Sequence, residues 1–258
     1  MDLFAQRVMT TPNFDSDEGL TPVNEFNQPV GVAMDNWTPP PFPPCKTLIG
    51  SYCQVEPFQT IRHAQKFWEA LSDDLSDARW TYMSFGPFPD FEDFKKWCVN
   101  TENYQDPQLY AIVVDEHAVG LVAYMRIDRN HGVIEVGRVV YSPRLVKTRA
   151  ATEAMYLLAN NVFQLGYRRF EWKCDSFNMA SRLAASRLGF TYEGMFRQAI
   201  IYKGRTRDTT WFSIIDADWN AGLKEAYTRW LDPSNFDEKG NQKLKLSKLT
   251  TPFMHARS

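Results

Sequence analysis

A strand, a short basic turn and a helix follow one another between residues 132 and 166, and this order constrains the fold more than any other stretch. Residues 133–141 are rich in β-branched side chains, which predicts a buried strand, and Pro143 ends it because proline cannot donate to a sheet ladder. After the turn, apolar side chains recur at helical spacing. We therefore expect a helix that begins at Thr148 or Arg149.

The turn before this helix is basic, since it carries Arg144, Lys147 and Arg149. The first N–H groups of a helix have no partner within it, so they bind anions, and neighbouring cations add to that binding. The turn is therefore expected to bind an anion, and a phosphate suits it best. The alternative is a basic surface turn without a ligand.

Four short motifs in and after this region carry a resemblance. They are Glu135 to Gly137, Ala151 to Leu158, Asn178 to Ser181 and Leu188 to Phe190. In their order and spacing they resemble the GNAT acetyltransferases, and the likeness runs from about Thr47 to about Leu249. Within that superfamily the chain is most similar to the branch that includes the N-terminal acetyltransferases of ribosomal proteins. The resemblance implies a transferase that takes an acetyl group from acetyl-CoA.

The expected helices and strands follow the order of that superfamily. Helices are expected at residues 60–71, 91–98, 148–165, 178–187 and 219–231, and strands at 47–58, 108–115, 118–128, 133–141, 169–174, 191–202 and 208–215. This order gives an α+β fold. The resemblance implies a mixed, mostly antiparallel central sheet flanked by helices and splayed between the fourth and fifth core strands, 133–141 and 169–174. The pantetheine arm of acetyl-CoA is expected in that gap.

The fifth of these strands has a regular alternation. Its apolar side chains are Phe170, Trp172 and Cys174, and its charged side chains are Arg169, Glu171 and Lys173. Successive side chains of a strand point to opposite faces, so this pattern predicts a half-buried strand.

The chain is expected to divide into three segments. Residues 1–45 hold eight of the 15 prolines and form a proline-rich arm that lies on the domain or on a partner subunit. A ligand for a proline-recognition domain is the sharper alternative for this arm. Residues 46–232 form the GNAT-like domain. Residues 233–258 form a charged tail, rich in lysine, that we expect to be mobile.

Composition limits the remaining classes. A net charge of −2 gives no general attraction to nucleic acid or to an anionic membrane, and no apolar run approaches the ~20 residues of a membrane span. The first residues lack the basic and apolar parts of a secretory signal. Four scattered cysteines without CxxC spacing and four dispersed histidines predict reduced thiols, a cytoplasmic location and no metal site.

Glu135 is the candidate catalytic base. An alkyl amine has a pKa near ~10 and arrives protonated, so a carboxylate, or a water held by one, must take its proton. Glu135 lies in an otherwise apolar strand, where an ionised carboxylate is costly unless it has a partner or a task. It also matches the glutamate of the family's strand motif. The alternatives are a structural pair with Arg138 or Arg126, or exposure to solvent.

The other chemical steps are less tied to side chains. In relatives a backbone N–H polarises the acetyl carbonyl, and here it would come from near Val139 or Val140. Many relatives place a tyrosine seven residues after the position of Asn178 to protonate the leaving thiolate, but Ala185 stands there. Ser181 or Ser186 is then a candidate to position a water. The thiolate can also leave without a donor, because a thiol pKa is near ~8.5.

The expected cofactor residues follow from the resemblance. The family's phosphate loop maps onto Val146, Arg149 and Ala151, and only the last position matches, so Lys147 and Arg149 supply charge where glycines are missing. The expected contacts to acetyl-CoA are Val139, Val140, Tyr141, Lys147, Thr148, Arg149, Ala150, Ala151, Thr152, Asn178 and Ser181. Asn178 is equally suited to cap its helix.

The acceptor is expected to be a primary amine: a protein N-terminus, a small amino compound or an antibiotic-like metabolite. The side chains expected to shape its pocket are Trp80, Phe85, Phe88, Arg197 and Tyr202. An aromatic cluster that only covers the core is the alternative for the first three. The expected reaction is direct attack in a ternary complex, in a protein that forms a homodimer or stays monomeric. The alternative function is a catalytically inactive GNAT-like module for acyl-CoA binding or protein interaction.

Overall fold

The computed structural model describes residues 22–73 and 76–255. Chain contacts divide the molecule into two units, with the boundary between Thr38 and Pro39. In the described part of the first unit, the side chain of Asn24 accepts hydrogen bonds from the N–H groups of Phe26 and Gln28. The first 21 residues of the expected proline-rich arm lie outside the described residues.

The second unit is built on one sheet of eight described strands in the order β1-β2-β3-β4-β5-β6-β8-β7. The strands are β1 (Leu48–Ile49), β2 (Gln54–Pro57), β3 (Gln108–Val114), β4 (His117–Asp128), β5 (Val133–Tyr141), β6 (Arg169–Asp175), β7 (Thr191–Tyr202) and β8 (Arg205–Ile215). All neighbours are antiparallel except β5 and β6. The predicted α+β fold with a mixed, mostly antiparallel sheet is confirmed.

The parallel pair β5–β6 separates part of the way along. Its register runs from Val133 opposite Arg169 to Val136 opposite Trp172. Both strands continue beyond that point. β5 runs on to Tyr141, and β6 runs on to Asp175 while it pairs with β8. The gap therefore opens between the two strands that the sequence indicated.

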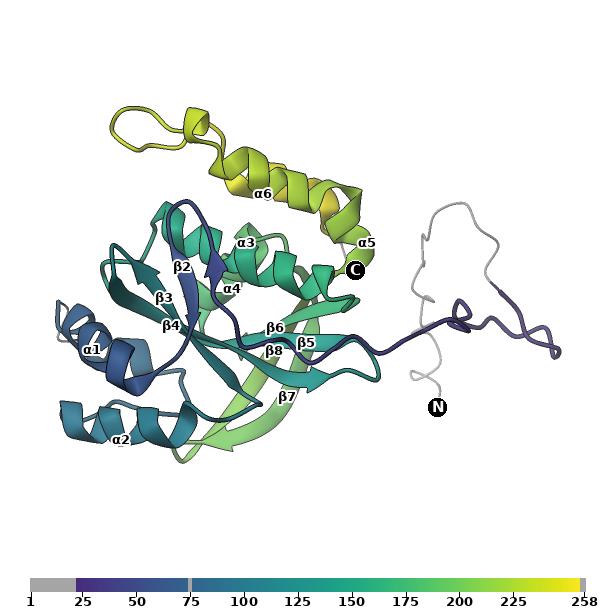
Figure 1. Cartoon of the computed structure of the whole chain (residues 1–258). Helices are drawn as coiled ribbons and strands as arrows, with labels where there is room; N and C mark the ends of the chain where they lie inside the picture. The colour runs from purple at the N-terminus through teal and green to yellow at the C-terminus, as the bar shows by residue number, and fades with distance from the viewer. Residues whose placement is uncertain (1–21, 74–75, 256–258) are drawn as a thin grey trace, which may run out of the picture. The chain divides into compact units, whose positions relative to one another are not determined.

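Helices cover both faces of the sheet, with α3 and α6 on one face and α1 and α2 on the other (Figure 1). The helical segments are η1 (Thr60–Ala64), α1 (Gln65–Leu71), η2 (Asp77–Trp80), α2 (Phe91–Thr101), α3 (Arg149–Gln164), α4 (Met179–Arg187), α5 (Asp216–Asp218), η3 (Trp219–Leu223), α6 (Lys224–Leu231), η4 (Pro233–Asn235), α7 (Leu246–Thr250) and η5 (Thr251–Phe253). Each face has its own apolar core, with Ile134 and Phe170 in one and Phe67 and Leu121 in the other.

Side-chain caps fix where three of these helices begin. Thr148 Oγ1 accepts the N–H of Ala151 at 3.1 Å at the start of α3, and Asn178 Oδ1 accepts the N–H of Ser181 at 3.1 Å at the start of α4. Asp90 does the same for α2. Such caps satisfy N–H groups that have no partner within the helix. The predicted helix starts are confirmed at these positions.

The proline run at residues 39–44 lies along the second unit. Its carbonyl oxygens accept hydrogen bonds from Arg129 Nε to Pro40 at 2.7 Å, from the Tyr167 hydroxyl to Pro41 at 3.2 Å and from Gln108 Nε2 to Pro43 at 3.0 Å. An extended proline segment has no internal hydrogen bonds, so its carbonyls are available to such donors. This part of the expected arm is therefore anchored to the sheet domain.

The C-terminal segment is packed, and the expected mobile tail is wrong for the described residues up to His255. Leu246 and Thr250 are fully buried, and α7 packs against α6. The side-chain amide of Asn235 donates to the Trp230 carbonyl at 2.9 Å, and the Phe236 ring lies 5.2 Å from the Trp230 ring. A few apolar side chains spaced among the lysines are enough to dock the segment.

Two further features are defined by the described residues alone. None of their helices combines the length and apolar character that crossing a bilayer requires. No group of three or more His, Cys, Asp or Glu side chains among them is placed to hold a metal ion.

Candidate active site

A bulge in β5 lies where the two parallel strands separate. Gly137 is opposite Ala123 and Val140 is opposite Leu121, so β5 carries one more residue than β4 between these pairs. Arg138 has a φ of 51°, a left-handed conformation typical of a bulge. Arg138 and Val139 have no register partner in β4 or in β6, both of which are described in full.

A cavity of about 950 Å³ opens beside this end of β5. Its walls come from the start of α3, from α4 and from the C-terminal segment, and Tyr141 and Trp172 line it from the two separated strands. Four cations line it: Lys147, Arg149, Arg187 and Lys245. No aspartate or glutamate is among its described lining residues. The charge of the cavity therefore favours an anionic ligand.

The two arginines of the cavity are held in place. Both terminal nitrogens of Arg187 donate to Thr152 Oγ1, at 3.1 and 3.2 Å, and its guanidinium lies 5.1 Å from the Trp230 ring. The guanidinium of Arg149 lies 3.9 Å from the Phe236 ring. Stacking on aromatic faces is favourable for arginine and fixes its plane. The C-terminal segment thus orients two cations of the cavity.

Most of the expected cofactor residues lie around this cavity, and some do not. The lining includes Tyr141, Lys147, Thr148, Arg149, Ala151 and Thr152. Val140 and Ala150 are buried in the core clusters and Val139 packs against one of them, and none of the three side chains lines the cavity. Asn178 caps α4, as the alternative had it.

Ser181 touches the cavity through a neighbour. Its hydroxyl accepts the indole N–H of Trp172 at 3.0 Å, and Trp172 lines the cavity. The lining residues that the sequence missed include two cations and two aromatic side chains: Arg187, Lys245, Trp230 and Phe236. For Phe236 and Lys245 the hint was a mixture of aromatic and basic residues, in the segment that the lysine content assigned to a mobile tail.

Glu135 is buried, with 5% of its surface exposed. Lys173 Nζ lies 3.0 Å and Arg126 Nε 3.3 Å from its Oε2, as ion pairs without hydrogen-bond alignment. Burial raises the pKa of the Glu135 carboxyl above its ordinary value, and Lys173 and Arg126 oppose that rise. The pair with Arg126 was one of the alternatives, whereas the pair with Lys173 was not foreseen.

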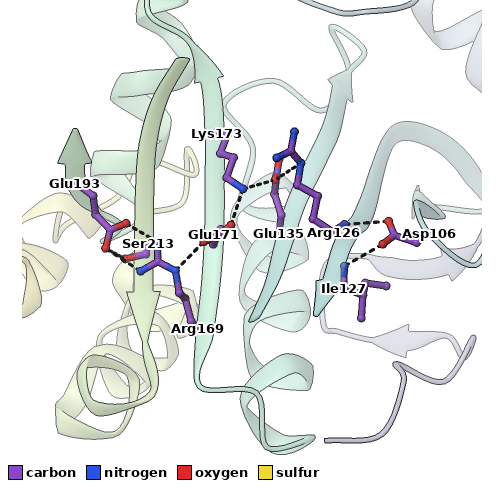
Figure 2. Close-up of polar contacts among 9 residues, drawn as sticks. All are labelled: Asp106, Arg126, Ile127, Glu135, Arg169, Glu171, Lys173, Glu193 and Ser213. Atoms are coloured by element: carbon purple, nitrogen blue, oxygen red, sulfur yellow. Dashed lines mark hydrogen bonds and ion pairs between the residues drawn. The ribbon is translucent and has the colours of Figure 1, made fainter. Parts of the chain in front are cut away.

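These charges belong to a longer network that reaches from β4 to β7, across five neighbouring strands of the sheet (Figure 2). Lys173 Nζ lies 2.6 Å from Glu171 Oε2, and Glu171 Oε1 accepts the Nε–H of Arg169 at 2.7 Å. Arg169 also pairs with Glu193 on β7. Cations and carboxylates alternate from Arg126 to Glu193, so every buried charge has an opposite neighbour.

This network corrects the expectation for β6. The charged face of that strand is not open to water, since the side chains of Glu171 and Lys173 are only 9% and 6% exposed. The alternation was interpreted as one buried and one exposed face. Both faces are buried because the neighbouring strands supply ions of the opposite sign.

Asp106 holds Arg126 in position for Glu135 (Figure 2). Its two carboxylate oxygens accept the N–H groups of Arg126 and Ile127, each at 2.9 Å. Arg126 has a φ of 51° and sits at a second irregularity, between β4 and β5. The bulge turns the Arg126 side chain toward Glu135.

Gly137 has a steric reason to be glycine. A Cβ atom on it would lie 2.3 Å from Met125 Sδ, closer than packed atoms approach one another. The same position is 3.4 Å from Glu135 Oε1, so this oxygen faces the bulge while Oε2 faces the cations. Glu135 thus has one oxygen engaged by cations and one directed toward the strand separation.

Three of the expected acceptor residues, Trp80, Phe85 and Phe88, form an aromatic cluster with Trp97. The Phe85 and Trp97 rings stack at 4.6 Å, and Trp80 meets Phe88 edge-on at 5.5 Å. Trp80 is buried, so for this residue the core-covering alternative holds. Arg197 is exposed on β7.

The β7–β8 hairpin reaches this aromatic cluster. Lys203 Nζ donates to the Trp80 carbonyl at 2.7 Å. The neighbouring Tyr202 hydroxyl donates to Asp175 Oδ2 at 2.7 Å, at the end of β6. Burial, together with the Asp175 hydrogen bond, raises the pKa of Tyr202 to about 12, so the phenol is protonated at neutral pH.

Comparisons with known proteins agree with this geometry. The family model described as acetyltransferase (GNAT) domain matches residues 55–191. The solved structure of a GCN5-related N-acetyltransferase from Brucella melitensis is 40% identical, with a TM-score of 0.82, and the match covers 84% of this chain and 100% of that chain. The SPbeta prophage-derived uncharacterized N-acetyltransferase YokL of Bacillus subtilis (strain 168) is 25% identical over 156 residues, 60% of this chain and 88% of that protein.

The solved structure of RimL, a ribosomal L7/L12 alpha-N-protein acetyltransferase, is more distant. It is 18% identical with a TM-score of 0.56, and the match covers 66% of this chain and 94% of that chain, which shows the fold alone. The family match, by contrast, includes the bulged strand, the basic turn and the helix that follows it. Together with the similarity to the Brucella protein over the whole of that chain, it establishes that this chain belongs to the GNAT acetyltransferase superfamily.

Proposed function

We propose that the protein is an N-acetyltransferase that moves an acetyl group from acetyl-CoA to a primary amine, by direct attack in a ternary complex. The observation that carries the proposal is the cation-lined cavity that begins where β5 and β6 separate. Coenzyme A carries several phosphate charges, and a cavity with four cations and no described carboxylate suits such a ligand. An inactive module would have no chemical need for a buried glutamate beside that opening.

Acetyl-CoA supplies an acetyl group as a thioester, and the protein supplies charge and position. Lys147, Arg149, Arg187 and Lys245 would hold its phosphates, with the N–H groups at the start of α3. Backbone N–H groups near Val139 or Val140 would polarise the acetyl carbonyl. No metal ion is needed for this chemistry.

Glu135 would take the proton of the acceptor amine, directly or through a water. Its Oε1 faces the bulge, and Lys173 and Arg126 hold the carboxylate in one orientation. A pKa raised by burial makes the carboxylate a stronger base than an exposed glutamate. The aromatic cluster with Phe85 and the hairpin with Tyr202 would form the acceptor side.

The resemblance implies that the acceptor is a primary amine, and it does not say which amine. We propose small amino compounds as acceptors. A protein N-terminus is a further candidate, because the chain resembles the branch with ribosomal-protein acetyltransferases. The four cysteines are free thiols, which supports a reducing compartment such as the cytoplasm. Exposed apolar side chains on the edge strand β7, including Phe196 and Ile201, support a homodimer.

Removing two cations from the cavity tests the cofactor site. We expect Lys147→Ala/Lys245→Ala to raise the Kd for acetyl-CoA about 10- to 100-fold, because each lysine contributes about 1 kcal/mol of charge-assisted binding. Both side chains are exposed, so the melting temperature should not change. Titration calorimetry in low salt measures the effect.

The matched control is Lys96→Ala/Lys248→Ala, which removes the same charge from exposed positions that do not line the cavity. Its Kd should equal that of the unmodified protein. An equal loss in both double variants would mean that only net charge matters, and this assignment of the cavity would be wrong.

Ser181 is proposed to orient a water near the leaving thiolate. Its hydroxyl accepts from Trp172, which leaves its own proton free to donate. We expect Ser181→Ala to lower kcat about tenfold, since a thiolate is a tolerable leaving group. Ser181→Thr keeps a hydroxyl and should restore most of the rate. A Ser181→Ala rate equal to that of the unmodified protein would remove Ser181 from the mechanism.

A further inference from the structure

Arg138 carries a charge that the described residues leave without a partner. Its Nη1 is buried and has no hydrogen-bond partner, and the guanidinium makes no ion pair with any of residues 22–73 or 76–255. A buried charge without a partner is costly, so such a group calls for an explanation. The residue as a whole is only half-buried, so part of it remains open to a ligand.

The bulge in β5 sets the direction of this side chain. With a φ of 51°, Arg138 turns toward α2, where its guanidinium lies 5.8 Å from the Phe85 ring and 5.9 Å from the Trp97 ring. Asp106 acts on the Arg138 charge without forming an ion pair with it, because its carboxylate oxygens accept the N–H groups of Arg126 and Ile127 at the β4 bulge. The aromatic rings hold the guanidinium without neutralising it.

Three other cations near Glu135 and the aromatic cluster already have acceptors. Arg126 pairs with Glu135, Lys173 lies between Glu135 and Glu171, and Lys203 donates to the Trp80 carbonyl. Arg138 is therefore the cation of this group whose charge is still available to a ligand. Arg138 directly precedes Val139, one of the residues whose backbone N–H would polarise the acetyl carbonyl. The Cα atoms of the two residues are about 3.8 Å apart.

We propose that Arg138 binds a carboxylate of the acceptor, which makes the preferred substrates amines that carry an acid group, such as free amino acids. This inference rests on the proposed function, because it names the substrate class of the same site. A guanidinium matches a carboxylate with two parallel hydrogen bonds. One cation suits a singly charged carboxylate better than a phosphate, which would bring more charge than Arg138 can neutralise.

Glu135 and Arg138 would together fix the orientation of the acceptor along β5. Glu135 lies three residues before Arg138 on the same strand and would receive the amine, while Arg138 would hold the carboxylate. The stacked Phe85 and Trp97 rings would contact the part of the substrate that lies between its amine and its carboxylate. Two anchors fix the amine toward the strand separation, which is the positioning that a direct attack requires.

The test compares amino acids with their amides as acceptors. Thiol release at saturating acetyl-CoA gives kcat/KM for phenylalanine and phenylalaninamide, and likewise for alanine and alaninamide. We expect Arg138→Gln to lower the acid-to-amide ratio about 10- to 100-fold, through KM for the acid, with the amide changed less than about twofold. Arg138→Lys keeps the charge and should restore part of the ratio. Lys96→Gln removes an exposed charge from α2 and should leave the ratio unchanged.

A ratio that Arg138→Gln leaves unchanged, in a protein that still acetylates amines, overturns this inference and leaves the transferase standing. Acetyl-CoA binding without turnover of any amine overturns the proposed function, and this inference with it. A measurement on the unmodified protein guards against an unfolded variant. N-acetylphenylalanine should quench tryptophan fluorescence more strongly than its amide, and Trp97→Phe should remove that difference; equal quenching by the two overturns the inference.

Discussion

Glu135→Gln is expected to lower kcat for acetyl transfer about 100- to 10,000-fold while acetyl-CoA still binds. General-base catalysis contributes a factor of this size, and glutamine keeps the shape of the side chain without its basicity. Glu135 does not line the cofactor cavity, so the Kd for acetyl-CoA should stay the same. Stopped thiol-release assays and calorimetry on the same preparation measure the two quantities.

The pH dependence of the rate separates this role from a structural one. The base works only when ionised, so kcat falls as the pH drops through its pKa. Burial raises the pKa of Glu135, which places this acid limb at a higher pH than for an ordinary carboxyl. The limb should be absent in Glu135→Gln, and the rise due to the amine itself should remain.

Glu171→Gln is the matched control, because it removes another buried carboxylate from the same network. Glu171 lies on β6 rather than beside the bulge, so its loss should lower the rate far less than the loss of Glu135. If both variants lose activity equally and both unfold at lower denaturant, the network is structural and Glu135 is not the base.

Glu153→Ala is expected to destabilise the fold by about 3–5 kcal/mol, which lowers the melting temperature by about 10 °C. The Glu153 carboxylate is buried and accepts the N–H groups of Ser51, Tyr52 and Cys53 at 2.7, 2.6 and 2.9 Å. Alanine would leave three N–H groups without their acceptor, that of Cys53 buried and those of Ser51 and Tyr52 partly buried. A buried donor without a partner costs about 1–3 kcal/mol, and the partly buried donors add to that cost. Urea unfolding followed by tryptophan fluorescence measures the loss.

Glu225→Ala serves as the control for this prediction, since Glu225 is an exposed glutamate on α6 and its loss should change stability by less than about 0.5 kcal/mol. Gly50→Ala tests the same turn in a second way. A Cβ on Gly50 would lie 2.3 Å from a Glu153 oxygen, so this substitution should also lower the free energy of unfolding. A Glu153→Ala protein as stable as Glu225→Ala would show that the turn does not depend on the carboxylate.

This turn also explains a limit of the sequence analysis. One strand was expected over residues 47–58, but the chain forms β1 and β2 with a turn between them. The partner that holds the turn, Glu153, is about 100 residues away, so no local pattern announces it. By contrast, β5 and α3 were predictable, because their β-branched run and apolar spacing are local properties of the chain.

The candidate site divides in the same way. Lys147 and Thr148 were found because a basic turn before a helix is visible in the sequence. Arg187 and Lys245 were missed, because their place in the cavity depends on how the C-terminal segment docks. Arg138 was considered only as a partner for Glu135, and its isolation became visible with the bulge that turns it toward α2.

The C-terminal wall of the cavity has a consequence for how the protein is made. The lining residues run from Tyr141 to Lys245, so the ribosome has to add more than a hundred residues after the first wall before the last one exists. A nascent chain with β5 and α3 already formed would still present an open, one-sided cavity. Coenzyme A can therefore stabilise the finished protein by mass action, but it cannot guide the early stages of folding.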